Sequence, residues 1–278
     1  MNTDDIMQLS LDLCGMKSIP LDSAIFHSKN NIHRILWGID INNNDLTKAK
    51  KEGYDLVISH HPLDQTAFIK MMYRHEELMI NAGVAPNLAK NACYKNEEPY
   101  RNWAAGLPSN DTQDLLTKIA NELDVGLMNI HNPSDELGRI ILQSIIDTET
   151  STVLRLMNKF RSIPEISKSG EDVELICGSN ENPLGKAVMI HAAGTNGGYH
   201  VANALFESGI QTVVYIHLNS PRMKAQLKQE NKGNLIITGH YASDSIGINP
   251  LIDKLEEKGI DIDCCNNLIR HRCDSSQR

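Results

Sequence analysis

The chain has 278 residues, of which 41% are hydrophobic and 22% are charged, and its formal net charge is −8. This composition is ordinary for a globular protein, and the acidic balance argues against nucleic-acid binding as the main role. No apolar run is long enough to span a bilayer, and the acidic residues after Met1 predict that no signal peptide starts here. Six scattered cysteines without a CxxC pair indicate reduced thiols, so we expect a cytoplasmic protein.

Predicted strands and helices alternate in the first half of the chain. Helices are expected at Thr3–Met16, Asn42–Gly53, Phe68–Ala82, Thr112–Leu123 and Leu137–Ile146. Strands are expected at Arg34–Asp40, Leu56–Ile58 and Val125–Ile130. We expect Asp45 to be the N-cap and Gly53 the C-cap of the second helix. Residues 87–110 are polar and have few apolar periods, so we expect a helix-and-loop excursion there.

The second half repeats this alternation, which predicts an α/β fold with largely parallel sheets. Strands are expected at Lys186–Ile190, Thr212–Ile216, Asn234–Thr238 and Asp261–Cys264. Helices are expected at Tyr199–Glu207, Met223–Glu230 and Ser243–Lys258. The tail from Arg270 onward is polar.

A short buried run ends abruptly in His60-His61-Pro62. The carboxyl ends of parallel strands form the edge where open α/β sheets place their ligands. Adjacent residues on a straight strand point to opposite faces, so His60 and His61 can serve one ion only where the strand breaks. Pro62 imposes such a break. The alternative is a surface loop that carries two histidines by chance.

Histidines close five of the predicted strands, namely His60, His131, His191, His217 and His240. Two of these have a carboxylate four residues later, Asp135 after His131 and Asp244 after His240. On one helical face such a pair can present a nitrogen and an oxygen together. Alternatively, Asp135 and Asp244 only cap the helices that follow them. For His191, His200 and His217, ordinary polar roles at loop starts are favoured.

Imidazole and carboxylate ligands without thiolates suit zinc, manganese, iron or cobalt, and a carboxylate can bridge two ions. The turn Gly194-Thr-Asn-Gly-Gly198 allows a different interpretation, because a glycine-rich turn before a helix can bind phosphate. It matches neither the dinucleotide-binding pattern nor the P-loop. We therefore expect a close-packing turn there first and a phosphate site second.

The motifs together resemble the Nif-three-like family, whose members are often labelled GTP cyclohydrolase I type 2 homologues or dinuclear-metal-centre hexameric proteins. The resemblance covers about residues 11–269 and rests on four elements, which are Ile39-Asp40, Ser59-His60-His61-Pro62-Leu63, His131-x-x-x-Asp135 and Gly239-His240-Tyr-Ala-Ser-Asp244. It implies two α/β lobes with a dimetal site in the cleft between them. We place these lobes at residues 1–130 and 131–278. It also implies a ring of six subunits.

By resemblance, the metal ligands are His60, His61, Asp135, His240 and Asp244. His131 would orient Asp135 or a substrate oxygen. The sequence departs from the family pattern in several places, among them the following two. The last ligand is usually glutamate but here is Asp244, and the excursion over residues 68–110 is longer than expected.

We therefore expect a protein that binds two divalent ions and acts as a hydrolase on a small, nucleotide-like substrate through a metal-bound hydroxide. One alternative is a non-catalytic, ring-forming metal carrier or chaperone-like protein with the same ligands, and the two differ in whether a coordination position stays open. Another is a nucleotide-binding regulator that uses the Gly194 turn, but no acidic ribose partner is identifiable.

Overall fold

The computed structural model describes residues 1–64, 66–106, 111–192 and 196–271, which form helices and two mostly parallel sheets. The chain divides into two compact units. Unit 1 comprises Met1–Phe68, Pro108–Leu137 and Asp244–Arg278, and unit 2 comprises Ile69–Leu107 and Gly138–Ser243. Each unit is thus assembled from separated stretches of chain, and the predicted lobe boundary at residue 130 stays a prediction. Among the described residues, no helix is long and apolar enough to cross a membrane.

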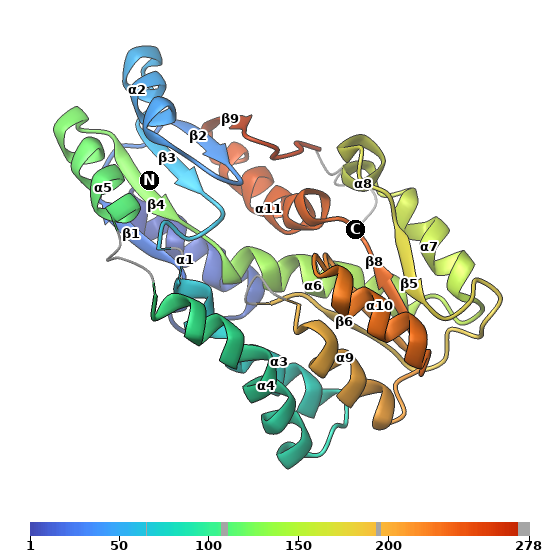
Figure 1. The fold of residues 1–278 in the computed structure, drawn as a ribbon. Helices are drawn as coiled ribbons and strands as arrows, with labels where there is room; N and C mark the ends of the chain where they lie inside the picture. Colours follow the sequence, from blue (N-terminus) through green and yellow to red (C-terminus); the bar gives the residue numbers. More distant parts are fainter. Residues whose placement is uncertain (65, 107–110, 193–195, 272–278) are drawn as a thin grey trace. The chain divides into compact units, whose positions relative to one another are not determined.

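Unit 1 contains a five-stranded sheet in the order β1-β4-β3-β2-β9. The strands are β1 (Ala24–His27), β2 (Arg34–Gly38), β3 (Leu56–Ser59), β4 (Gly126–Asn129) and β9 (Asp261–Cys265). β1 is antiparallel to β4, and the other neighbours are parallel. β3 lies between β2 and β4 (Figure 1). It is buried at all four positions, as its continuous apolar run predicts.

The helices of unit 1 are α1 (Thr3–Cys14), α2 (Asn43–Glu52), α5 (Asp111–Leu123), the start of α6 (Asn132–Asp147) and most of α11 (His240–Glu256). The start of α2 differs from prediction. Asn42 is the N-cap, and Asp45 is the third helical residue, whose carboxylate accepts a hydrogen bond from the Asn42 amide. Gly53 ends the helix with a φ of 77°, which confirms the predicted C-cap.

Unit 2 contains a four-stranded sheet in the order β5-β8-β7-β6, in which only β5 runs antiparallel to its neighbour. The strands are β5 (Glu174–Cys177), β6 (Ala187–Ile190), β7 (Thr212–Tyr215) and β8 (Asn234–Ile237). Its helices are α3 (Tyr73–Asn81), α4 (Pro86–Ala104), α7 (Val153–Arg161), α8 (Pro164–Ser169), α9 (Gly198–Glu207) and α10 (Pro221–Glu230), together with most of α6. A 3₁₀ turn, η1 (Ala67–Met71), joins the units.

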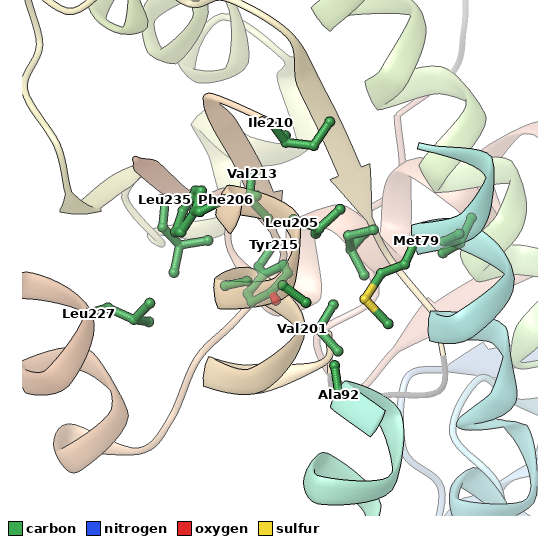
Figure 2. Packing of buried hydrophobic residues seen from close by; sticks show 14 of the residues in the cluster. Met79, Ala92, Val201, Leu205, Phe206, Ile210, Val213, Tyr215, Leu227 and Leu235 are labelled. Atoms are coloured by element: carbon green, nitrogen blue, oxygen red, sulfur yellow. The ribbon is translucent and has the colours of Figure 1, made fainter. Parts of the chain in front are cut away.

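The core of unit 2 joins residues from distant parts of the chain. Val201 and Leu205 of α9 pack in one cluster with Tyr215 of β7, Met79 of α3 and Ala92 of α4 (Figure 2). Helices α3 and α4 therefore belong to the core of unit 2. Residues 86–104 form a single helix of 19 residues despite an internal proline, so the expected excursion is helical over most of its length.

Candidate metal centre

Two adjacent histidines follow β3, and the backbone holds both in place. The amides of His60 and His61 each donate a hydrogen bond of 2.9 Å, to the carbonyl oxygens of Gly38 and Ile39 respectively. The chain then turns at Pro62, which has no amide hydrogen to donate. The imidazole of His60 is fully buried, that of His61 is 23% exposed, and their ring centroids are 5.2 Å apart. Both rings thus lie together just beyond the strand end.

A carboxylate beside these rings comes from the first turn of α6. Because α6 starts at Asn132, Asp135 lies inside the helix, and the alternative that it caps a helix starting at Leu137 is wrong. Asp135 is 1% exposed, and its amide donates a hydrogen bond of 3.0 Å to the carbonyl oxygen of His131. The helix macrodipole stabilises a negative charge in this first turn.

The second carboxylate, Asp244, comes from α11 and is not its cap either. α11 starts at His240, and the Glu171 carboxylate accepts hydrogen bonds from the amides of His240 and Ala242, at 2.8 and 3.0 Å. Asp244 is 1% exposed and belongs to unit 1. His240 precedes it by one helical turn and belongs to unit 2. Unit 1 therefore brings together four of the five predicted ligands and also His131.

Four nitrogen–oxygen separations connect the histidines to these carboxylates. Nε2 of His60 lies 3.4 Å from Oδ1 of Asp135 and 3.6 Å from Oδ2 of Asp244. Nε2 of His61 lies 3.6 Å from the same oxygen of Asp244, and Nε2 of His131 lies 3.7 Å from Oδ2 of Asp135. Charge-assisted hydrogen bonds of this kind measure about 2.7–2.9 Å. The observed separations suit two ligands that share a cation about 2.0–2.2 Å from each atom.

The other ring nitrogen of each histidine has a hydrogen-bond acceptor. Nδ1 of His60 lies 3.1 Å from the carbonyl oxygen of Ile130. Nδ1 of His61 lies 2.8 Å from Oδ1 of Asp40, and Nδ1 of His131 lies 2.6 Å from Oδ2 of Asp22. A carbonyl or carboxylate oxygen accepts here, so Nδ1 carries the hydrogen in all three rings. This leaves Nε2 free of that hydrogen. A metal-binding histidine normally donates its second ring N–H to an oxygen in the same way.

The electrostatic environment of these rings favours positive charge. Burial lowers the pKa of His60, but the carboxylates of Asp244 and Asp135 outweigh it and raise that pKa to about 10. Burial also lowers the pKa of His61, but the neighbouring carboxylates of Asp244 and Asp40 outweigh it and raise that pKa to about 9. Two buried carboxylates so close to each other require compensating positive charge, from protons on the imidazoles or from metal ions.

Two groups of side chains within unit 1 have the spacing of a metal site. The imidazoles of His60, His61 and His131 form one group, and His60, Asp135 and Asp244 form the other, with ligand atoms in each group within 4.8 Å of one another. Among the described residues these groups contain only nitrogen and oxygen donors. Such a donor set fits zinc, iron, cobalt or manganese. The buried His and Asp groups could therefore hold metal ions.

One residue of this arrangement, Asp22, was not predicted from the sequence. It precedes β1, a strand of four residues that the periodicity did not reveal. Ala24 of β1 pairs with Asn129 of β4, and this pairing brings Asp22 to the end of β4 beside His131. Asp40 was noted only as the end of a predicted strand and as part of the family motif, without a role in the site.

The remaining histidines noted in the sequence lie in unit 2. His191 is 1% exposed and packs closely against Gly138 of α6, where an added Cβ would come within 3.1 Å of the ring. His200 lies on α9, and burial lowers its pKa. The His217 ring lies 4.5 Å from that of His240, so His217 neighbours a predicted ligand, which the sequence reasoning missed. The predicted Gly194 turn lies partly outside the described residues.

Comparison with known proteins identifies the family. No family model matches the sequence, and no curated protein matches it. Among solved structures, a NIF3 superfamily protein from Sphaerobacter thermophilus is 34% identical, with a TM-score of 0.89, over 96% of this chain and 99% of that chain.

Two further structures show the same fold at low sequence identity. HcgD from Methanocaldococcus jannaschii is 15% identical with a TM-score of 0.61, over 95% of this chain and 97% of that chain. TTHA1606 from Thermus thermophilus is 13% identical with a TM-score of 0.56, over 98% of this chain and 99% of that chain. The family resemblance noted in the sequence is thus confirmed by the relative at 34% identity. The chain belongs to the NIF3 superfamily.

Proposed function

We propose that the protein holds two divalent metal ions, with His60, His61, Asp135, His240 and Asp244 as ligands. The ions would be zinc, iron, manganese or cobalt, in keeping with nitrogen and oxygen donors. The observation that carries this proposal is the set of separations between buried imidazole nitrogens and carboxylate oxygens, 3.4–3.7 Å. These atoms are too far apart for normal hydrogen bonds and well spaced to share cations.

The number of donors supports two ions rather than one. A catalytic site for one ion needs about three protein ligands and an open position. Five ligands exceed that need, and Asp135 offers Oδ1 toward His60 and Oδ2 toward His131. A carboxylate that faces different nitrogens with its two oxygens is suited to bridging two ions.

The function that this centre supports best is hydrolysis of a small, nucleotide-like substrate. Divalent ions, when bound, supply Lewis acidity and make a water molecule nucleophilic near neutral pH. The histidines would hold the ions through Nε2, while Ile130 and Asp40 keep the hydrogens of His60 and His61 on Nδ1. The buried carboxylates offset the charge of the cations.

The competing proposal is a ring-forming metal carrier or chaperone-like protein without turnover. It requires a closed coordination shell, whereas a hydrolase leaves a position for water or substrate. The protein loaded with Co²⁺ distinguishes the two, because a small anion such as azide changes the visible absorption of cobalt only when it can enter an open position. Hydrolysis predicts such a change at millimolar azide, and an unchanged spectrum at saturating metal would contradict it.

Assembly and location complete the proposal. We include a homohexamer and a cytoplasmic location, the first from family resemblance alone. Among the described cysteines, Cys93, Cys177, Cys264 and Cys265 are free thiols. Free thiols in this number are typical of a reducing compartment.

A further inference from the structure

A buried carboxylate holds His131 from the side opposite the metal-binding groups. Oδ2 of Asp22 lies 2.6 Å from Nδ1 of His131, and the two residues are only 2% and 3% exposed. A bond this short between buried groups is of the strong, charge-assisted kind. It keeps the hydrogen on Nδ1 and leaves Nε2 to face Asp135, 3.7 Å from Oδ2.

The backbone around this pair is tied to β4, so the ring cannot easily turn away. The amide of His131 donates a hydrogen bond of 3.0 Å to Oγ of Ser23. Nδ2 of Asn129 donates a hydrogen bond of 2.6 Å to the carbonyl oxygen of Asp22. Nδ2 of Asn132 lies 3.4 Å from Oδ2 of Asp22. Rotating the imidazole would break its buried hydrogen bond to Asp22, which is costly.

His131 has the same two-sided arrangement as the histidines predicted to be ligands. Its ring centroid lies 5.0 Å from that of His60 and 5.9 Å from that of His61. The ligand atoms of the three rings lie within 4.8 Å of one another. Small side-chain rotations would bring these nitrogens to the spacing of about 3.3 Å that two ligands of one tetrahedral zinc have.

We propose that His131 is itself a metal ligand through Nε2, and that Asp22 is the positioning residue that keeps it available. This inference rests on the proposed metal centre and replaces the orienting role expected for His131. It gives unit 1 three imidazole donors, and a cluster of imidazoles favours zinc, cobalt or iron over magnesium. Histidine ligands with a carboxylate on the far nitrogen are a recurrent device of metal sites.

The competing explanation is structural: Asp22 and His131 only fasten the segment before β1 to β4. Ser23 contributes to the same attachment through its hydroxyl group. A purely structural pair would affect the stability of the metal-free protein, and Ser23→Ala would act in the same direction as Asp22→Asn. Under this explanation, all of these substitutions would leave the metal affinity and the cobalt spectrum unchanged.

The test is Co²⁺ titration of the native chain and of four variants, with visible absorption and metal affinity as readouts. Asp22→Asn should weaken binding at one ion about 10–100-fold and alter the cobalt absorption, the usual cost of losing such a support. His131→Gln should weaken the binding of the same ion at least as much. Ser23→Ala and His27→Gln should bind as the native protein does. His27 is a matched control, because its Nδ1 also has a side-chain partner, Asn121, and it belongs to none of the described metal groups.

The outcomes separate this inference from the proposed centre. Native affinity and spectrum in both Asp22→Asn and His131→Gln would overturn the role of His131 and leave a five-ligand centre standing. A native chain that binds no cobalt would overturn both. If His131→Gln does not fold, Asp22→Asn decides alone, because it preserves the shape of the side chain, and its folding is checked by melting the metal-free protein.

Discussion

Nε2 of His60 lies 3.4 Å from Oδ1 of Asp135, and both side chains are buried. If this carboxylate holds ions together with His60, its removal should empty at least part of the centre. We expect Asp135→Ala, after reconstitution with excess metal and gel filtration, to retain at most half of the native metal content by elemental analysis.

The control for this variant lies on the same helix. Asp147 is an exposed residue at the other end of α6. Asp147→Ala should retain the full metal content. If Asp135→Ala does so as well, Asp135 is not a ligand.

Asp244 is the second carboxylate to test, because glutamate is usual at this position in the family. Asp244→Glu should change the affinity for one ion about ten-fold or more, comparable to the effect of disturbing a supporting residue. Asp244→Asn should be worse, since it also removes a buried negative charge that offsets the cations. Isothermal titration with Zn²⁺ or Co²⁺ measures both effects.

The exposed Asp261 of β9 provides the matched substitution Asp261→Asn, which should leave affinity unchanged. Because Glu171 caps α11, loss of a cap cannot explain a change at Asp244. Native affinity in Asp244→Asn would remove Asp244 from the ligand set.

His75 predicts a pH dependence of stability that does not involve the metal centre. Burial lowers its pKa to about 4, although the bond from Nε2 to the carbonyl oxygen of Ala192, 2.9 Å long, acts in the opposite direction. Between pH 6.5 and 4 the unfolded chain binds a proton at His75 that the folded chain does not. Stability contributed by the neutral ring is therefore present above pH 6.5 and lost as pH falls toward 4, by up to about 3 kcal/mol.

Urea denaturation of the native protein and of His75→Gln at pH 7 and pH 4.5 measures this effect. Glutamine can still donate to the Ala192 carbonyl oxygen but does not titrate. The native protein should lose about 2–3 kcal/mol more than the variant between the two pH values. Equal losses would show that His75 is protonated without cost in the folded state.

The proposed hexamer is tested by light scattering coupled to gel filtration at micromolar concentration. The expected mass is six times the 31.0 kDa of one chain. A monodisperse monomer would exclude the hexamer. It would leave the metal centre untouched, since four of its five proposed ligands come from unit 1 of a single chain.

Local patterns predicted much of the fold from the sequence. The buried run of β3, the glycine at the end of α2 and the alternation of strands and helices all depend on interactions between near neighbours. The hydrophobic pattern predicted strands less well where they were short and paired with residues far away in the sequence. β1 has four half-buried residues, and only its pairing with β4 defines it.

One helix that the sequence analysis missed, α7, did have a signal in the sequence. α7 buries Val153, Leu156, Met157 and Phe160 at helical spacing, which the sequence displays. For the candidate site, the histidine and aspartate motifs identified the residues that converge in unit 1. Asp22 could not be predicted, because no local pattern links it to His131, 109 positions away.

The central claim is that the protein is a dinuclear metal protein, and metal stoichiometry tests it most directly. Elemental analysis of the purified, reconstituted native protein should give close to two divalent ions per chain. A folded protein that retains less than one ion per chain under these conditions would contradict the account.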